Sequence, residues 1–188
     1  MDKTQRATVG YNHGNGRQCV AFVFACPGQK ELLAGKVVAG ATGRNLDRLL
    51  EYLHRSRPDI FTSMERYDYC ICNSSDRVFY KGYLGSDRTL PNRADICHPE
   101  NLRRLKRELL APHIRYAIFF GRQACIAMEL LEKTCGPKPV LIRGKCHLGM
   151  MAINRIRLPE RYADRTGTER AAARIRVIAM DVLKKMKD

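Results

Sequence analysis

The stretch Cys19-Val-Ala-Phe-Val-Phe-Ala-Cys26 is an uninterrupted apolar run that ends at Pro27-Gly28. A short apolar run that is closed by a turn is typical of a strand buried on both faces, as in a parallel sheet. The run is much shorter than the roughly 20 residues that a helix needs to cross a bilayer. We therefore predict that residues 19–26 form a buried strand of a sheet.

Strand-like and helix-like segments alternate along the rest of the chain. Further strands are predicted at residues 67–72, 114–120 and 140–146. Helices are predicted at residues 43–55, 99–110 and 122–133, and a last helix begins at the capping box Thr166-x-x-Glu169. This alternation predicts an α/β fold, a three-layer α/β/α sandwich around a four-stranded parallel sheet. We expect residues 1–18, which are polar and glycine-rich, to form a flexible N-terminal arm before a single domain at 19–188.

The chain is strongly basic. It has 34 Lys and Arg against 19 Asp and Glu, which gives a formal net charge of +15 over 188 residues. Residues 95–188 hold 20 of the basic and 10 of the acidic side chains, so this half carries most of the excess. Clustered basic side chains favour a polyanionic partner, because phosphate contacts release condensed counterions. Solvated helix faces are the alternative interpretation of such clusters.

Several classes of site are disfavoured. Neither Gly-x-Gly-x-x-Gly nor Gly-Lys-Ser/Thr occurs, which argues against a dinucleotide fold or a phosphate loop, and so against an enzyme acting on small nucleotides. The eight cysteines include no Cys-x-x-Cys pair, so we expect reduced thiols and no bound metal. No apolar segment follows the polar residues 1–6, which predicts no signal peptide, no membrane partner and a cytoplasmic, nucleoid-associated location.

Polar and glycine-rich motifs follow the predicted strands, where parallel sheets place their working sites. In chain order they are Pro27-Gly28-Gln29-Lys30-Glu31, Gly40-Ala-Thr-Gly43, Asn73, Gly121-Arg122-Gln123-Ala124 and His147. This order resembles that of the bacterial branches of the uracil-DNA glycosylase superfamily. The likeness spans about residues 19–155 and depends on the order of short motifs.

The resemblance implies hydrolysis of the N-glycosidic bond of a base that is flipped out of DNA, by a monomeric enzyme without a cofactor. It implies a catalytic role for His147, bonded to the departing base, for which a structural histidine is the alternative. Gln29 and Glu31 are the other catalytic candidates, as the nearest polar substitutes in the first motif. Only Glu31 could act as a base, and it could equally be structural.

The resemblance also implies a base pocket formed by Asn73, Cys26, Pro27, Gly28 and Val38, in which Asn73 reads the base edge; a loop asparagine that caps the backbone is the alternative for Asn73. It implies DNA contacts by Gly121, Arg122, Leu148, Gly149, Met150 and Met151, with Met150 and Met151 in a loop that enters the minor groove; core packing is the alternative for the two methionines. The basic run after this loop adds Arg155 and Arg157 as expected DNA contacts. The DNA would be a duplex with an extruded base, or single-stranded.

The first motif departs from the family. Ala25 and Cys26 stand where family members usually carry a carboxylate or amide, and Val38 stands where an aromatic ring usually stacks on the base. No cysteine precedes Cys19, so we expect none of the iron–sulfur clusters that some branches hold. The smaller side chains predict a pocket for a base bulkier than uracil, such as a modified pyrimidine of phage DNA. They also keep open an alternative, a catalytically inactive module of the same fold that binds modified or damaged DNA.

Overall fold

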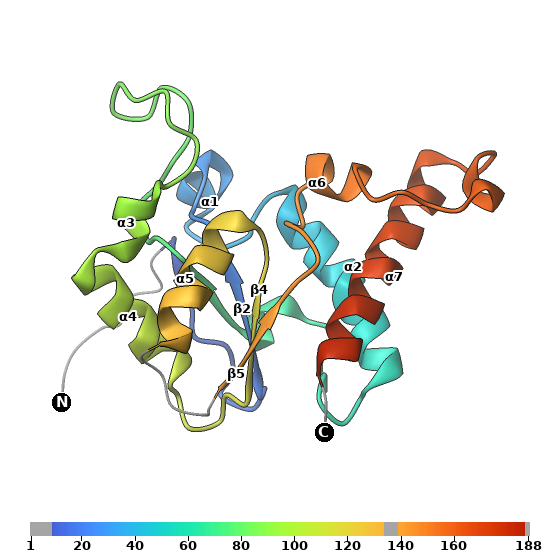
Figure 1. The fold of residues 1–188 in the computed structure, drawn as a ribbon, viewed down its shortest axis with the longest axis horizontal. Coiled ribbons are helices and arrows are strands. Elements are labelled where there is room, and N and C mark those ends of the chain that lie inside the picture. Colours follow the sequence, from blue (N-terminus) through green and yellow to red (C-terminus); the bar gives the residue numbers. More distant parts are fainter. Residues whose placement is uncertain (1–8, 134–138, 187–188) are drawn as a thin grey trace.

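The computed structural model of the chain describes residues 9–133 and 139–186 and shows an α/β fold (Figure 1). The sheet has the strand order β1-β3-β2-β4-β5. The strands are β1 (Tyr11–Asn12), β2 (Val20–Phe24), β3 (Cys70–Asn73), β4 (Tyr116–Phe119) and β5 (Val140–Arg143). Strands β2 to β5 are parallel, so the four predicted parallel strands are confirmed.

Strand β2 lies at the centre of the sheet, and all five of its residues are buried. Phe22 is in register with Ile71 of β3 on one side and with Ile118 of β4 on the other. The continuous apolar run at 20–24 is therefore explained by helices covering both faces of the sheet, as predicted.

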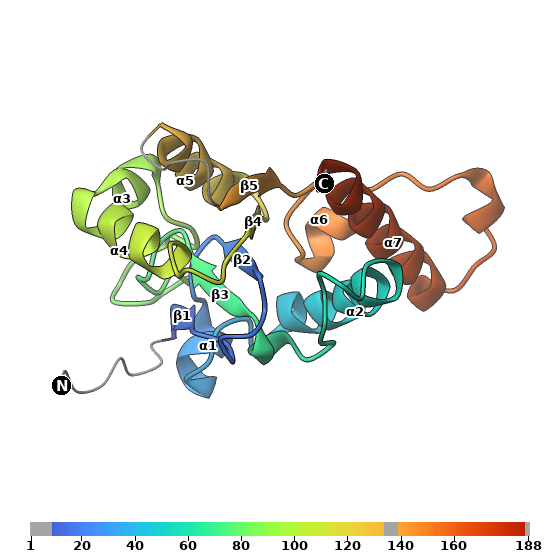
Figure 2. The same ribbon diagram turned by 90° about the horizontal axis from the view of Figure 1, so that it is seen from below.

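Two helical layers cover the sheet, α2 and α7 on one face and α3, α4 and α5 on the other (Figure 2). The helices on these layers are α2 (Ala41–Ser56), α3 (Arg93–Cys97), α4 (Pro99–Leu109), α5 (Arg122–Glu132) and α7 (Gly167–Lys185). The leucines of α2 and the apolar face of α7 are buried together against one side of the sheet. The predicted capping box holds α7: the Thr166 hydroxyl accepts from the Glu169 N–H. No helix in the described ranges is long and apolar enough to span a bilayer.

Part of the predicted N-terminal arm belongs to the sheet, which corrects the expectation of a flexible arm at Tyr11 and Asn12. Tyr11 and Asn12 pair antiparallel with β3, so the sheet has five strands and not four. The Asn12 amide donates to the carbonyls of Tyr67 and Tyr69, at 3.0 and 2.8 Å, and this fixes the strand at the edge. A two-residue strand has no periodicity that the sequence could reveal. Residues 1–8 of the arm lie outside the described residues.

Some boundaries also differ from the prediction. The segment predicted as a strand from residue 67 begins with a 3₁₀ turn, Arg66–Asp68, and β5 ends three residues before Cys146. Short helical elements that the sequence pattern did not show are α1 (Gln29–Ala34), α3 (Arg93–Cys97), α6 (Met150–Asn154) and a 3₁₀ turn at Glu160–Tyr162. Helix α1 follows β2 directly, and α6 follows the His147 loop. Both therefore begin at the carboxyl edge of the sheet.

Candidate functional site

His147 follows β5 and is held in one orientation. Its Nδ1 accepts a hydrogen bond from the backbone N–H of Gly149 at 2.8 Å. Its ring meets the ring of Phe24, the last residue of β2, edge to face with centroids 6.3 Å apart. Burial lowers the pKa of His147, which favours the neutral imidazole. Because Nδ1 accepts, the neutral ring carries its proton on Nε2 and can donate it in a hydrogen bond.

A cavity of about 870 Å³ adjoins His147. Its lining includes Gly121 and Arg122 at the start of α5, Cys146 beside the histidine, and the cations Arg143 and Lys145. Gly121 has a φ of +97°, and a Cβ there would lie 3.0 Å from Cδ2 of His147. A glycine at this position thus permits both the left-handed backbone and the close approach of the imidazole. The structure therefore brings the predicted residues His147, Gly121 and Arg122 together.

The segment after His147 is anchored at one end and exposed at the other. Leu148 is fully buried, and its carbonyl accepts from Nδ2 of Asn45 in α2 at 2.7 Å. Met151 is 77% exposed, whereas Met150 is 39% exposed and its sulfur contacts the Asn45 amide at 3.4 Å. Core packing does not explain the exposure of Met151. Asn45 is a positioning residue that the motif comparison missed.

Glu31 acts as a backbone cap. Its Oε2 accepts from the N–H of Gly28 at 3.1 Å, and its Oε1 accepts from the N–H of Gly40 at 3.3 Å. The carboxylate thereby joins the turn after β2 to the start of α2, and both of its oxygens have backbone partners. Gln29 is the exposed first residue of α1. This geometry favours a structural role for Glu31 over that of a general base.

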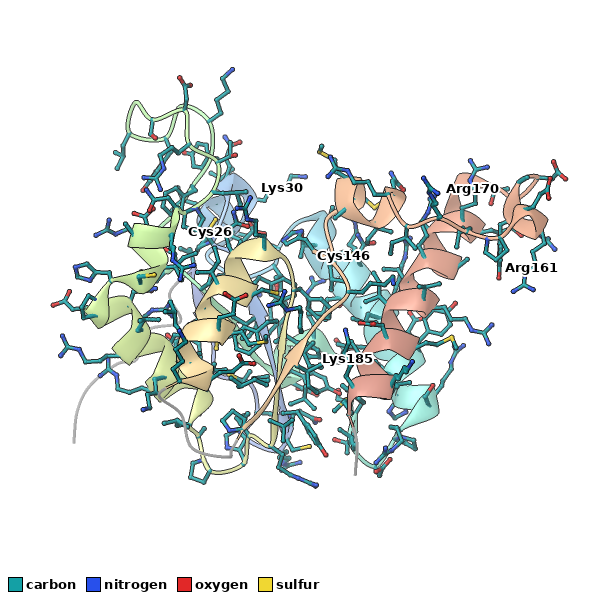
Figure 3. The ribbon with its side chains drawn as sticks, viewed as in Figure 1. Cys26, Lys30, Cys146, Arg161, Arg170 and Lys185 are labelled. Atoms are coloured by element: carbon teal, nitrogen blue, oxygen red, sulfur yellow. The ribbon has the colours of Figure 1, made fainter. Side chains whose placement is uncertain are left out.

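Cys26 and Pro27 form the turn after β2. Burial, with a smaller contribution from the nearby Glu31 carboxylate, raises the pKa of Cys26 to about 12, so its thiol is neutral at physiological pH. The Pro27 carbonyl accepts from the N–H of Phe79 at 2.9 Å, which brings the long segment after β3 against this turn. Cys26 and Cys146 both lie toward the carboxyl edge of the sheet (Figure 3).

Asn73 ends β3 and is buried. Its side-chain amide donates to the Gly10 carbonyl at 3.2 Å, and its own carbonyl accepts from Nη2 of Arg104 at 2.8 Å. Neither Asn73 nor Cys26 is among the residues that line the His147 cavity. The structure therefore gives Asn73 a bond to the N-terminal segment and does not bring it together with His147 in that cavity.

Val38 lies in the core on the α2 side of the sheet and also does not line the His147 cavity. Its φ is +45°, a left-handed conformation that is unusual for a β-branched residue. The strained turn brings its carbonyl so close to α2 that a Cβ on Gly43 would lie 1.8 Å from the Val38 oxygen. Gly43 thus permits the close approach of this turn.

A buried ion pair supports the carboxyl end of β3. Arg104 of α4 donates to Oε2 of Glu108 at 2.6 Å and to Oδ1 of Asn101 at 2.8 Å, in addition to the Asn73 carbonyl. Burial raises the pKa of Glu108, and the neighbouring guanidinium opposes this shift. The motif comparison missed this network. The i,i+4 spacing of Arg104 and Glu108 is the signal that could have found it.

The arginines that follow α6 in the chain differ in exposure and in hydrogen bonding. Arg155 and Arg157 are exposed. Arg174 of α7 donates to the Ile156 carbonyl at 3.1 Å and to Oδ1 of Asn154 at 3.2 Å, so it holds the segment in place. Arg161 and Arg170 lie at the end of the molecule farthest from α4, around the start of α7 (Figure 3).

No group of three or more His, Cys, Asp or Glu side chains that could hold a metal ion occurs in the described part of the chain. Cys135 lies outside the described residues.

No protein-family model matches the chain, and the search of curated proteins gives no match either. The functional assignment therefore depends on the residues and on the geometry of the site.

Proposed function

We propose that the protein is a monofunctional DNA glycosylase that draws a base out of DNA and hydrolyses its N-glycosidic bond. The observation that carries the proposal is the arrangement of His147. A neutral imidazole, oriented by Gly149, adjoins a large cavity at the carboxyl edge of the sheet. A donor fixed in this way stabilises negative charge that develops on a departing base.

The charge of the surroundings supports a nucleic acid as the substrate. Arg122 and Lys145 line the cavity, Arg143 lines it in an ion pair with Glu129, and the whole chain carries a net charge of +15. The exposed Met151 begins the segment that leads to Arg155 and Arg157. An apolar side chain of this kind unstacks base steps, and the cations that follow contact phosphates.

Water is the nucleophile in this proposal. The departing base takes the electron pair of the broken N-glycosidic bond, and the Nε2–H of His147 stabilises it as an anion. Water adds to C1′ of the sugar and loses a proton to solvent, which leaves an abasic site. Because both Glu31 oxygens have backbone partners, the proposal assigns that residue no proton transfer. Catalysis then depends on a base that is a good leaving group.

A second candidate function is a DNA-binding module without hydrolytic activity. The neutral Cys26 thiol in the first motif and the capped Glu31 favour this candidate, because neither orients a water molecule. The positioned histidine favours the enzyme, since binding alone does not require an oriented donor beside the cavity.

The test is a panel of duplexes that contain uracil, hypoxanthine, hydroxymethylcytosine or glucosylated hydroxymethylcytosine, followed by alkaline cleavage of abasic sites. The proposal expects strand breaks with at least one of these bases. Breaks in the uracil duplex alone would contradict the prediction of a bulkier base. DNA binding without release of any base would favour the binding module.

A further inference from the structure

The segment between β3 and α3 forms a prong at the carboxyl edge of the sheet. It rises above α3 and stands apart from the helical layers (Figure 1). We call residues 77–90 the aromatic prong, because Phe79, Tyr80 and Tyr83 lie within this short stretch. None of the motifs in the resemblance falls on it.

The foot of the aromatic prong is fixed. The N–H of Phe79 donates to the Pro27 carbonyl at 2.9 Å. The guanidinium of Arg88 lies over the Phe79 ring, 5.1 Å from its centroid, and also forms an ion pair with Asp95 of α3. Hydrogen bonding at Phe79 and ion pairing at Arg88 therefore hold the prong near both of its ends.

The tip is a tight turn that exposes apolar surface. The N–H groups of Tyr83 and Ser86 donate to the carbonyls of Tyr80 and Tyr83, at 3.0 Å each. This turn holds Leu84 at a φ of +49°, and its side chain is 89% exposed. The rings of Tyr80 and Tyr83 pack with centroids 4.9 Å apart. Leu84 therefore combines a left-handed backbone with an exposed apolar side chain at the tip of the prong.

A cavity of about 560 Å³ lies within the prong. Val78, Phe79, Tyr83 and Leu84 supply its apolar and aromatic walls. Arg77 and Arg88 also line it, together with Asp76 and Asp95, and both arginines form ion pairs with Asp95. The paired charges leave the aromatic wall as the feature that suits an unpaired nucleotide, because a ring stacks on a base of any sequence.

The prong continues directly into the candidate site. Pro91, Asn92 and Arg93, which follow it in the chain, line the His147 cavity. A DNA strand that occupies both cavities would therefore run along one continuous segment of the protein.

From these observations we propose that the aromatic prong binds an unpaired nucleotide of the DNA strand, stacked on Tyr83, next to the base that enters the His147 cavity. This inference depends on the proposed function and makes it more specific: the preferred substrate is single-stranded DNA, or a duplex that is opened beside the target base. Lys81 at the tip adds a positive charge for the backbone of that strand.

The test compares Tyr83→Ala with the unaltered protein by fluorescence anisotropy, with a single-stranded oligonucleotide and a fully paired duplex at one salt concentration. Stacking of one base predicts a loss of single-strand affinity on the order of 10- to 100-fold in Tyr83→Ala. Affinity for the paired duplex is expected to stay within about twofold, because a paired base does not reach the prong. Tyr83→Phe retains the ring and is expected to bind single strands like the unaltered protein.

Met180→Ala is the matched control, because Met180 is 61% exposed on α7, away from the prong. It is expected to leave both affinities unchanged. An equal loss for both DNA forms in Tyr83→Ala, or no loss for either, would overturn the inference while leaving the proposed function standing. If the unaltered protein binds neither DNA form, both the inference and the proposed function fail.

Discussion

Gly149 lies two residues after His147, and its backbone N–H donates a hydrogen bond to Nδ1 of His147 at 2.8 Å. This one bond fixes both the orientation of the ring and the nitrogen that carries its proton. Gly149 is also the residue before α6, so the contact joins the imidazole to the helix that exposes Met151. The donor and the apolar side chain assigned to DNA therefore belong to one short structural unit.

The protonation of His147 predicts how base release depends on pH. Burial lowers the pKa of His147 in the folded protein below its ordinary value of about 6.5. The ring should therefore stay neutral as pH falls below 6.5, and the rate of base release should not change with pH until the folded-state pKa is reached. At lower pH the ring gains a proton on Nδ1, which removes the acceptor of the Gly149 bond.

The same shift predicts the sign of a stability change. The stability that the neutral ring contributes is present above the pKa of the unfolded state and is lost as pH falls through the pKa of the folded state. An NMR titration of the ring protons measures this pKa directly. A folded-state pKa for His147 above the ordinary value of about 6.5 would contradict the assignment.

Glu31→Gln separates the capping role of Glu31 from a catalytic one. The glutamine oxygen can still accept from one of the two N–H groups, of Gly28 or Gly40, but its NH₂ group cannot accept from the other. We therefore expect a loss of about 1 kcal/mol in the free energy of unfolding. Base release should stay within about threefold, whereas removal of a general base costs about 100-fold or more. Chemical denaturation and single-turnover kinetics measure the two effects. Glu51→Gln, at an exposed position of α2, is the control.

Gly43→Ala tests the strained turn at Val38. The added Cβ would lie 1.8 Å from the Val38 carbonyl oxygen, so the turn or α2 must shift. We expect a loss of about 3 kcal/mol in the free energy of unfolding, measured by urea denaturation. Gly167→Ala is the matched control, because no described residue lies within 4 Å of a Cβ there. Equal stability of the two variants would show that the turn relaxes without cost.

The arginines after α6 predict a difference in the salt dependence of DNA binding. Each phosphate contact contributes about 0.9 to the slope of log K against log salt. With duplex DNA, the double variant Arg155→Ala/Arg157→Ala should therefore make this negative slope shallower by about 1.8. Arg174→Ala should leave the slope unchanged and reduce stability by about 1 kcal/mol, since Arg174 bonds to the Ile156 carbonyl. A change of slope in Arg174→Ala larger than that in the double variant would contradict the assignment of the phosphate contacts to Arg155 and Arg157.

The sequence predicts the fold better than it predicts the site. The apolar run at 20–24 and the leucines of α2 predict β2 and α2, because burial on both faces or on one helical face leaves a periodic pattern. The pairing of Tyr11 with Cys72 leaves no such pattern, since it depends on bonds from Asn12 to carbonyls more than 50 residues away. The short motifs after the strands likewise carry no pattern that reveals which distant residues they contact.

The position of His147 beside Gly121 agrees with the motif order, but motif order does not reveal contacts across the fold. Asn73 has the predicted place at the end of β3, yet its amide binds the Gly10 carbonyl in the segment predicted as an arm. The bond from Asn45 to Leu148 joins residues 103 positions apart. Such partners follow from the packing of the helices on the sheet, which local sequence does not encode.

The most direct test of the central claim is the single-turnover rate of base release by His147→Ala, on whichever duplex of the panel the unaltered protein cleaves. Removal of an oriented donor from a departing anion predicts a rate lower by about 100- to 1,000-fold, with DNA affinity retained. A rate equal to that of the unaltered protein, or no release of any base by the unaltered protein, would contradict the claim.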